Sequence, residues 1–134
     1  MAISLNHTIV PARDKRASAG FLAGILGLPV GEPMGPFIPV RIGESLTLDF
    51  ADVDFATRGV TDIAPHHYAF EVGEPEFDQI FDRIVRAGLD YYAEPHEPKR
   101  FGEINTSRGG RAVYFDDPDG HIMEIMTTSG VDPL

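Results

Sequence analysis

Two histidines stand in similar apolar contexts in this chain, and each is followed by a carboxylate inside a strand-like stretch. The histidines are His7 and His67, sixty positions apart, and the carboxylates are Asp49 and Glu124. Two histidines and one carboxylate are a common ligand set for a catalytic divalent metal, because they leave coordination positions open for a substrate. The pattern therefore indicates a repeated unit whose two copies contribute to a metal site.

Strand alternation indicates which of these side chains share a face. Around His67 the apolar side chains fall on one face with His66, whereas His67 itself falls on the opposite face. Glu124 and Asp49 are also flanked by apolar residues, so we expect each to point away from the face that packs on a helix. A duplicated unit pairs His7 with His67 and Asp49 with Glu124, and we expect the four groups to converge.

Apolar periodicity and turn residues predict a similar order of elements in both halves. The first half is predicted to contain strands at 3–10, 36–43 and 45–52, a helix from Asp14 to Leu26 and a connector at 54–64. The second half is predicted to contain strands at 66–72, 89–94, 111–116 and 121–127, and a helix ending at Gly88 that buries Phe77, Ile80, Phe81, Ile84 and Val85. Single helices among antiparallel-looking strands indicate an α+β fold with curved sheets. We expect one domain over residues 1–134, with module one at about 1–58 and module two at about 64–128.

The long segment at 95–111 gathers basic residues in an acidic chain. Four of the eleven basic residues lie within thirteen positions, at Lys99, Arg100, Arg108 and Arg111. One interpretation is a solvated loop, and the other is a lid in which Arg108 or Arg111 binds a carboxylate or phosphate of the substrate. Proton transfer beside the metal needs a nearby base, for which Asp49 and Tyr114 are the candidates; Tyr114 could also hydrogen-bond the substrate.

Composition restricts the partners and the compartment. A chain of 134 residues can bury a core without disulfides, and the absence of cysteine removes thiolate ligands and a cysteine nucleophile. The net charge of −10 argues against nucleic acid and anionic membrane as partners. No signal peptide and no membrane-spanning apolar run is evident, so we expect a cytoplasmic protein that acts on a small molecule.

These motifs resemble those of the vicinal oxygen chelate superfamily, which includes glyoxalase I, extradiol dioxygenases, fosfomycin-modifying thiol transferases and bleomycin-binding resistance proteins. The matching stretches are Leu5-Asn6-His7, His67-Tyr68-Ala69-Phe70, and Tyr114-Phe115-Asp116-Asp117-Pro118-Asp119-Gly120-His121 leading into Glu124. The resemblance implies two tandem βαβββ modules that form a curved, cup-like mixed sheet around a metal held by His7, His67 and Glu124. It also implies a homodimer. Asp49 takes the place of the fourth ligand of glyoxalase I-like members and is one methylene shorter.

Three functions follow from the resemblance. The leading expectation is a glyoxalase-like lyase or isomerase that uses a divalent metal (Fe, Mn, Ni, Zn or Mg) and a small substrate that chelates the metal through oxygen atoms. The first alternative is an Fe(II) extradiol-type dioxygenase. The second is a drug- or metabolite-binding resistance protein without catalysis.

Overall fold

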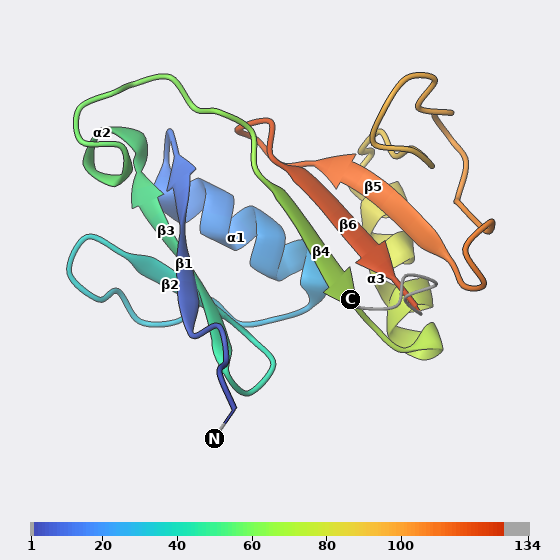
Figure 1. Cartoon of the computed structure of the whole chain (residues 1–134), viewed down its shortest axis with the longest axis horizontal. Coiled ribbons are helices and arrows are strands. Elements are labelled where there is room, and N and C mark those ends of the chain that lie inside the picture. Colours follow the sequence, from blue (N-terminus) through green and yellow to red (C-terminus); the bar gives the residue numbers. More distant parts are fainter. Residues whose placement is uncertain (1, 128–134) are drawn as a thin grey trace. The chain divides into compact units, whose positions relative to one another are not determined.

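The chain folds into two compact units, Met1–Ala64 and Pro65–Leu134. The computed structural model describes residues 2–127. Each unit has its own three-stranded mixed sheet and its own long helix (Figure 1).

Unit 1 is built on a sheet of strand order β1-β3-β2. Its elements are β1 (His7–Ala12), α1 (Lys15–Leu26), β2 (Ile38–Ile42), β3 (Leu46–Asp52) and the short α2 (Val53–Ala56). Strand β3 pairs parallel with β1 and antiparallel with β2. Helix α1 packs on one face of this sheet, where Val10, Val40 and Leu48 are buried.

The ends of α1 follow directly from local sequence. The Asp14 carboxylate accepts hydrogen bonds from the backbone N–H groups of Arg16 and Ala17, which would otherwise lack partners in the first turn. Gly27 ends the helix in the left-handed conformation, with φ 76°, which glycine adopts without steric cost. The buried residues of α1 include Ala19, Leu22 and Ala23, which recur at helical spacing.

Unit 2 repeats the arrangement with strand order β4-β6-β5. Its elements are β4 (His67–Glu71), α3 (Glu74–Arg86), β5 (Ala112–Asp116) and β6 (Ile122–Met126), with β6 parallel to β4 and antiparallel to β5. Phe77, Ile80 and Ile84 of α3 are buried. Val85 is 50% exposed, so the prediction that it packs inward is wrong. One residue beyond Ile84 the helix has turned by about 100°, which carries Val85 off the packed face.

The α+β class and the mixed sheets are confirmed, with two differences from the predicted elements. The stretch 89–94 is not a strand; Tyr92 alone makes bridges, to Phe101 and to Tyr114. The connector at 54–64 contains most of α2. Within residues 2–127, each unit therefore has three strands around its helix rather than the four of a full βαβββ module.

The two sheets place the candidate ligands at equivalent register positions. Asp49 on β3 pairs with Ile9, two residues after His7, and Glu124 on β6 pairs with Ala69, two residues after His67. Neighbouring residues of a sheet point to the same face, so the acid and the histidine of each unit share a face. The duplication inferred from sequence is thus present in the strand pairing itself.

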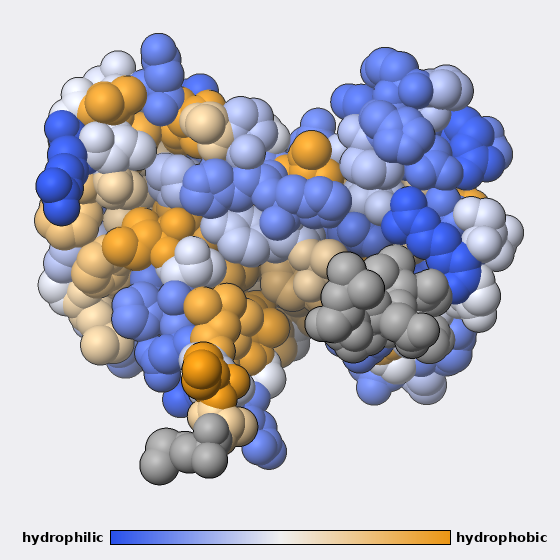
Figure 2. Space-filling view, viewed as in Figure 1, coloured by the Kyte–Doolittle hydropathy of each residue, from blue (hydrophilic) through white to orange (hydrophobic). Residues whose placement is uncertain are grey.

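The surfaces of the two units differ in character. The long loop at 95–110 of unit 2 is mostly hydrophilic in Figure 2, although it exposes Phe101. Unit 1 exposes large apolar side chains, and Ile3, Leu5 and Met34 are each more than half exposed. Among residues 2–127, no helix is long and apolar enough to cross a membrane.

Candidate metal centre

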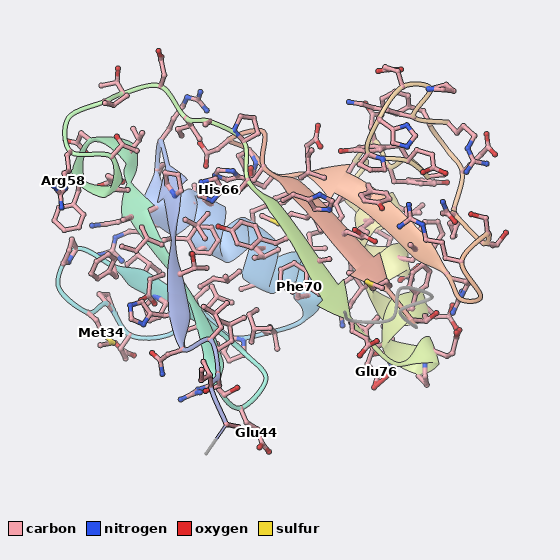
Figure 3. All side chains as sticks on the ribbon, in the orientation of Figure 1. Met34, Glu44, Arg58, His66, Phe70 and Glu76 are labelled. Atoms are coloured by element: carbon pink, nitrogen blue, oxygen red, sulfur yellow. The ribbon has the colours of Figure 1, made fainter. Side chains whose placement is uncertain are left out.

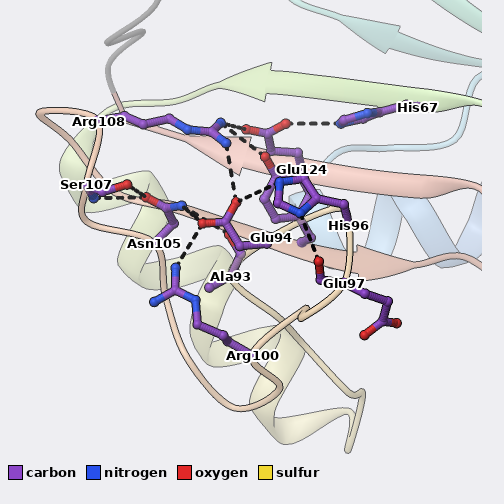
Figure 4. Close-up of polar contacts among 11 residues, drawn as sticks. His67, Ala93, Glu94, His96, Glu97, Arg100, Asn105, Ser107, Arg108 and Glu124 are labelled. Carbon is purple, nitrogen blue, oxygen red and sulfur yellow. Dashed lines mark hydrogen bonds and ion pairs between the residues drawn. The ribbon is translucent and has the colours of Figure 1, made fainter.

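His67 and Glu124 face each other across the β4–β6 pair. The Nε2 atom of His67 lies 3.0 Å from Oε1 of Glu124, and Figure 4 shows this contact. The Glu124 side chain is only 6% exposed, whereas that of His67 is 43% exposed. The buried Glu124 carboxylate and the partly exposed His67 imidazole lie on one face of the sheet. A small ligand can therefore reach the pair from the side of His67.

His66 belongs to a different cluster. Its Nδ1 is 2.7 Å from the Tyr68 hydroxyl, and its backbone N–H donates to Nδ1 of the buried His121 at 2.8 Å. Burial and the nearby His121 lower the pKa of His66. Figure 3 marks His66 beside β4. The structure brings His67, and not His66, to Glu124, as strand alternation indicated.

Tyr114 lies beside this pair on the neighbouring strand β5. It pairs with Glu124 in the strand register, and its ring centroid is 5.8 Å from that of His67. The Tyr114 side chain is buried and stacks on Tyr92, with centroids 5.7 Å apart. Burial raises the pKa of the Tyr114 phenol, and a hydrogen bond from Arg108 offsets part of the rise. At neutral pH Tyr114 is therefore a neutral phenol that can donate a hydrogen bond.

Arg108 is the arginine that reaches the pair. Its Nη1 donates to the Tyr114 hydroxyl at 3.2 Å and lies 3.9 Å from Oε2 of Glu124. Its Nη2 lies 3.6 Å from Oε2 of Glu94. A guanidinium thus stands between two carboxylates and beside a phenol, where it can attract an anionic group of a ligand.

Sequence reasoning did not find Glu94 and Asn105, which organise the loop around Arg108. Glu94 Oε1 accepts from Arg100 Nη2 at 2.9 Å and from Asn105 Nδ2 at 2.8 Å. Asn105 is buried, and its Oδ1 accepts from the backbone and hydroxyl groups of Ser107 at 2.9 Å. A lone Glu and a lone Asn in a polar loop carry no periodic signal, so only the folded loop shows their roles.

The structure does not bring Arg111 to this cluster. Its guanidinium instead binds two exposed acids of α3, Glu74 at 2.6 Å and Asp78 at 2.8 Å, and lies 4.2 Å from the centre of the Phe77 ring. The hydrogen bond to Asp78 is the main cause that raises the pKa of Arg111. Arg111 therefore fastens the start of β5 to α3, and we do not retain it as a substrate ligand.

Unit 1 carries His7, Asp49 and a hollow on the same sheet. The ring nitrogen Nδ1 of His7 is 2.8 Å from the Asn6 amide oxygen, and the tautomer that donates from Nδ1 to this oxygen leaves Nε2 as the acceptor atom. In the register His7 lies beside Thr47, which is one of the residues lining a cavity of about 340 Å³. The cavity is lined by Pro29, Gly31, Glu32, Met34, Pro39, Arg41 and Thr47, and Figure 3 marks Met34.

The donor atoms at His67 and Glu124 fit a divalent metal. An imidazole nitrogen and a carboxylate oxygen that point at each other are both ligand atoms, and a cation would satisfy both lone pairs at once. Within residues 2–127, no group of three or more His, Asp or Glu side chains forms a complete site, so the fit rests on this pair. His7, the third predicted ligand, belongs to unit 1, and its part in a metal site stays a prediction.

The whole chain is similar to solved structures, and part of it is similar to fosfomycin-modifying proteins. The solved structure of Oxidase ChaP-H2 is 53% identical, covers 97% of this chain and 99% of that one, and has a TM-score of 0.88. Oxidase ChaP-H1 is 50% identical over 98% of this chain and 100% of that one, also with a TM-score of 0.88. Metallothiol transferase FosB of Shouchella clausii (strain KSM-K16) is 36% identical over 61 residues, which is 46% of this chain and only 37% of that protein. No family model matches the chain.

The structure thus contains two α+β units of the same strand pairing, and in the second a histidine and a glutamate face each other on neighbouring strands. The chain belongs to the vicinal oxygen chelate superfamily, as its similarity to fosfomycin resistance proteins and to a glyoxalase/dioxygenase also shows. Membership supports a divalent metal and a small-molecule substrate in general, and it does not favour glyoxalase chemistry in particular.

Proposed function

We propose that this protein is a divalent-metal-dependent oxidase whose small substrate binds the metal through oxygen atoms. The observation that carries the proposal is the 53% identity, over nearly the whole of both chains, to a protein named as an oxidase. The glyoxalase-like lyase, our leading expectation from sequence, has weaker support, because the similar structure named as a lactoylglutathione lyase is only 18% identical to this chain. The shorter acid at Asp49 also argues against a fourth metal ligand of the glyoxalase type.

In this proposal His7, His67 and Glu124 hold the metal, and iron is the metal that suits them best. Two histidines and one carboxylate are typical of non-haem Fe(II) enzymes that use dioxygen. When bound, Fe(II) would supply open coordination positions and a centre through which electrons pass from the substrate to dioxygen.

In this proposal Tyr114 would hydrogen-bond the substrate, and Arg108 would attract its negative charge. The neutral Tyr114 phenol would donate a hydrogen bond to a substrate oxygen, since its raised pKa keeps its proton in place. Arg108 would attract the substrate as an enolate, phenolate or carboxylate, because its guanidinium lies beside the Tyr114 hydroxyl. Asp49 of unit 1 remains our candidate for a proton acceptor.

This function requires both units, and we propose that residues 1–134 act as one domain. His7 comes from unit 1, whereas His67 and Glu124 come from unit 2. We also propose a homodimer, which would cover apolar side chains such as Leu5 and Met34 that unit 1 exposes. Sedimentation equilibrium of the full chain should give twice the chain mass; a monomer at all concentrations would refute the dimer.

The test of the function is metal reconstitution followed by oxygen uptake. Metal-free protein should be loaded without oxygen with Fe(II), Mn(II), Ni(II), Zn(II) or Mg(II) and then mixed with oxygenated buffer and a panel of catechols and enolisable ketones. We expect oxygen consumption with Fe(II) and at least one substrate. Turnover of a thiohemiacetal by the Ni(II) or Zn(II) form, without oxygen uptake, would instead establish the lyase.

Matched variants connect the activity to the site. Glu124→Gln should weaken metal binding and abolish oxygen uptake, because the amide keeps the size of the side chain but removes its charge. Glu97→Gln, an exposed residue of the long loop, is the control and should change neither. Unchanged metal affinity in Glu124→Gln would show that the carboxylate ligand lies elsewhere.

A further inference from the structure

Glu124 has a cationic partner within the protein. Its carboxylate is nearly buried, and the Nη1 atom of Arg108 lies 3.9 Å from its Oε2. A buried carboxylate is costly without a compensating charge, so this arginine balances Glu124 when no metal is bound.

Arg108 has two carboxylate partners at similar distances. Glu124 is 3.9 Å from Nη1, and Glu94 is 3.6 Å from Nη2. Neither is the close, two-pronged contact that fixes an arginine most firmly, and the shorter hydrogen bond of Arg108 goes to the Tyr114 hydroxyl at 3.2 Å. The guanidinium is therefore placed to move its charge toward either acid.

The Glu94 carboxylate is held in an orientation in which it can pair with the Arg108 guanidinium. Its Oε1 is already engaged by Arg100 at 2.9 Å and by the buried Asn105 at 2.8 Å, which hold the carboxylate in one orientation. Its Oε2 faces Arg108, with His96 further away at 3.8 Å. The Glu94 side chain is 19% exposed, so water screens its attraction for Arg108 only in part. Figure 4 shows the alternating series of charges from His67 through Glu124, Arg108 and Glu94 to Arg100.

We propose that Arg108 is the internal counterion of Glu124, and that Glu94 takes over this arginine when a divalent cation binds at His67 and Glu124. Without Glu94, the positive charge stays beside Glu124 and opposes the incoming cation. Glu94 is thus a positioning residue that sets the affinity for the metal, although it does not touch the metal. The inference rests on the metal site of the proposed function, but on neither the substrate nor the reaction.

The test is a double-mutant cycle read by metal affinity rather than by activity. The metal-free full chain and its Glu94→Gln, Arg108→Gln and doubly substituted variants should be titrated with Co²⁺ by calorimetry and by visible absorbance. We expect Glu94→Gln to weaken binding about fivefold or more and Arg108→Gln to tighten it by a similar factor, which is the range of coupled sites. The double variant should bind like Arg108→Gln, because Glu94 acts only through the arginine.

Controls separate this inference from a structural role and from the site itself. Glu103→Gln removes the same charge from the same loop, where Glu103 contacts Arg100 at 3.6 Å, and it should not change Co²⁺ affinity. If Glu94→Gln weakens binding equally with and without Arg108, Glu94 only supports the loop and the inference is wrong. If Glu94→Gln does not fold, Arg108→Gln alone decides, since weaker or unchanged binding refutes the counterion. If Glu124→Gln leaves the affinity unchanged, the metal site of the proposed function fails instead.

Discussion

Replacing Arg111 with alanine should destabilise the protein without affecting its metal site. Arg111 precedes β5, and its guanidinium joins Glu74 and Asp78 at 2.6 and 2.8 Å while covering the Phe77 ring at 4.2 Å. Its partners belong to α3 and none is a candidate ligand. The substitution therefore separates the two arginines that the sequence alone could not distinguish, Arg108 and Arg111.

The expected loss can be worked out from these contacts. Because Glu74 and Asp78 are 62% and 68% exposed, water screens both ion pairs, and together they contribute roughly 0.5–1.5 kcal/mol. The contact with the face of Phe77 adds about 0.5–1 kcal/mol. The free energy of unfolding should thus fall by about 1–2.5 kcal/mol, which corresponds to a Tm lower by roughly 4–8 °C for a chain of this size.

The assay is thermal and urea unfolding of Arg111→Ala beside Arg108→Ala, with a Co²⁺ titration of each. At 1 M NaCl, where the screening length is about 3 Å, the ion-pair part of the Arg111 effect should shrink and the aromatic part should remain. Arg108→Ala should show the reverse pattern, with altered Co²⁺ affinity and a smaller change in stability. A tenfold change in Co²⁺ affinity in Arg111→Ala, together with an unchanged Tm, would refute our assignment of the two arginines.

Three further predictions concern the packing and the buried phenols. Asp14→Ala should cost about 1 kcal/mol in urea unfolding, because two N–H groups of α1 lose their acceptor; an unchanged midpoint would contradict this. Phe77→Ala should cost about 3–5 kcal/mol by the same measurement, because the side chain is fully buried; a loss below 1 kcal/mol would show that α3 is loosely packed. Burial raises the pKa of both Tyr92 and Tyr114 in the folded chain, so stability that is present below about pH 10 should be lost as the pH rises through the folded values. Tyr92→Phe should reduce this alkaline loss, as unfolding free energies measured from pH 9 to about pH 12 will show.

Helix caps and strand alternation predicted the helices and strands of this fold better than they predicted the segment around Tyr92. The ends of helix α1 could be predicted, because the capping residue Asp14 and the terminating residue Gly27 directly flank the helix in the sequence. Strand alternation also placed the side chains of His67 and Glu124 on a common face, because the apolar residues on either side of each take the opposite face. The stretch around Tyr92 was wrongly predicted as a strand, because its partners, Phe101 and Tyr114, are set by the course of the loop.

The partners of the charged loop residues could not be predicted for a related reason. Arg108 and Arg111 lie three positions apart with the same side chain, yet one contacts Tyr114 and the other contacts Glu74. The difference arises because Asn105 pairs with Ala112 in the backbone and fixes where the loop enters β5. Such pairing depends on tertiary structure and leaves no periodic trace in the sequence.

Asp49 and Glu124 occupy equivalent positions in the two sheets, so the residues next to them can be compared directly. Asp49 pairs with Ile9 and Pro39, whereas the equivalent Glu124 pairs with Ala69 and Tyr114. The same backbone position thus carries a side chain without hydrogen-bonding atoms in one unit and a phenol in the other. Proline at this position also contributes to the wall of the unit 1 cavity. We infer that the two units kept the same strand pairing while the neighbour of the acid diverged, so that the phenol beside Glu124 has no counterpart beside Asp49.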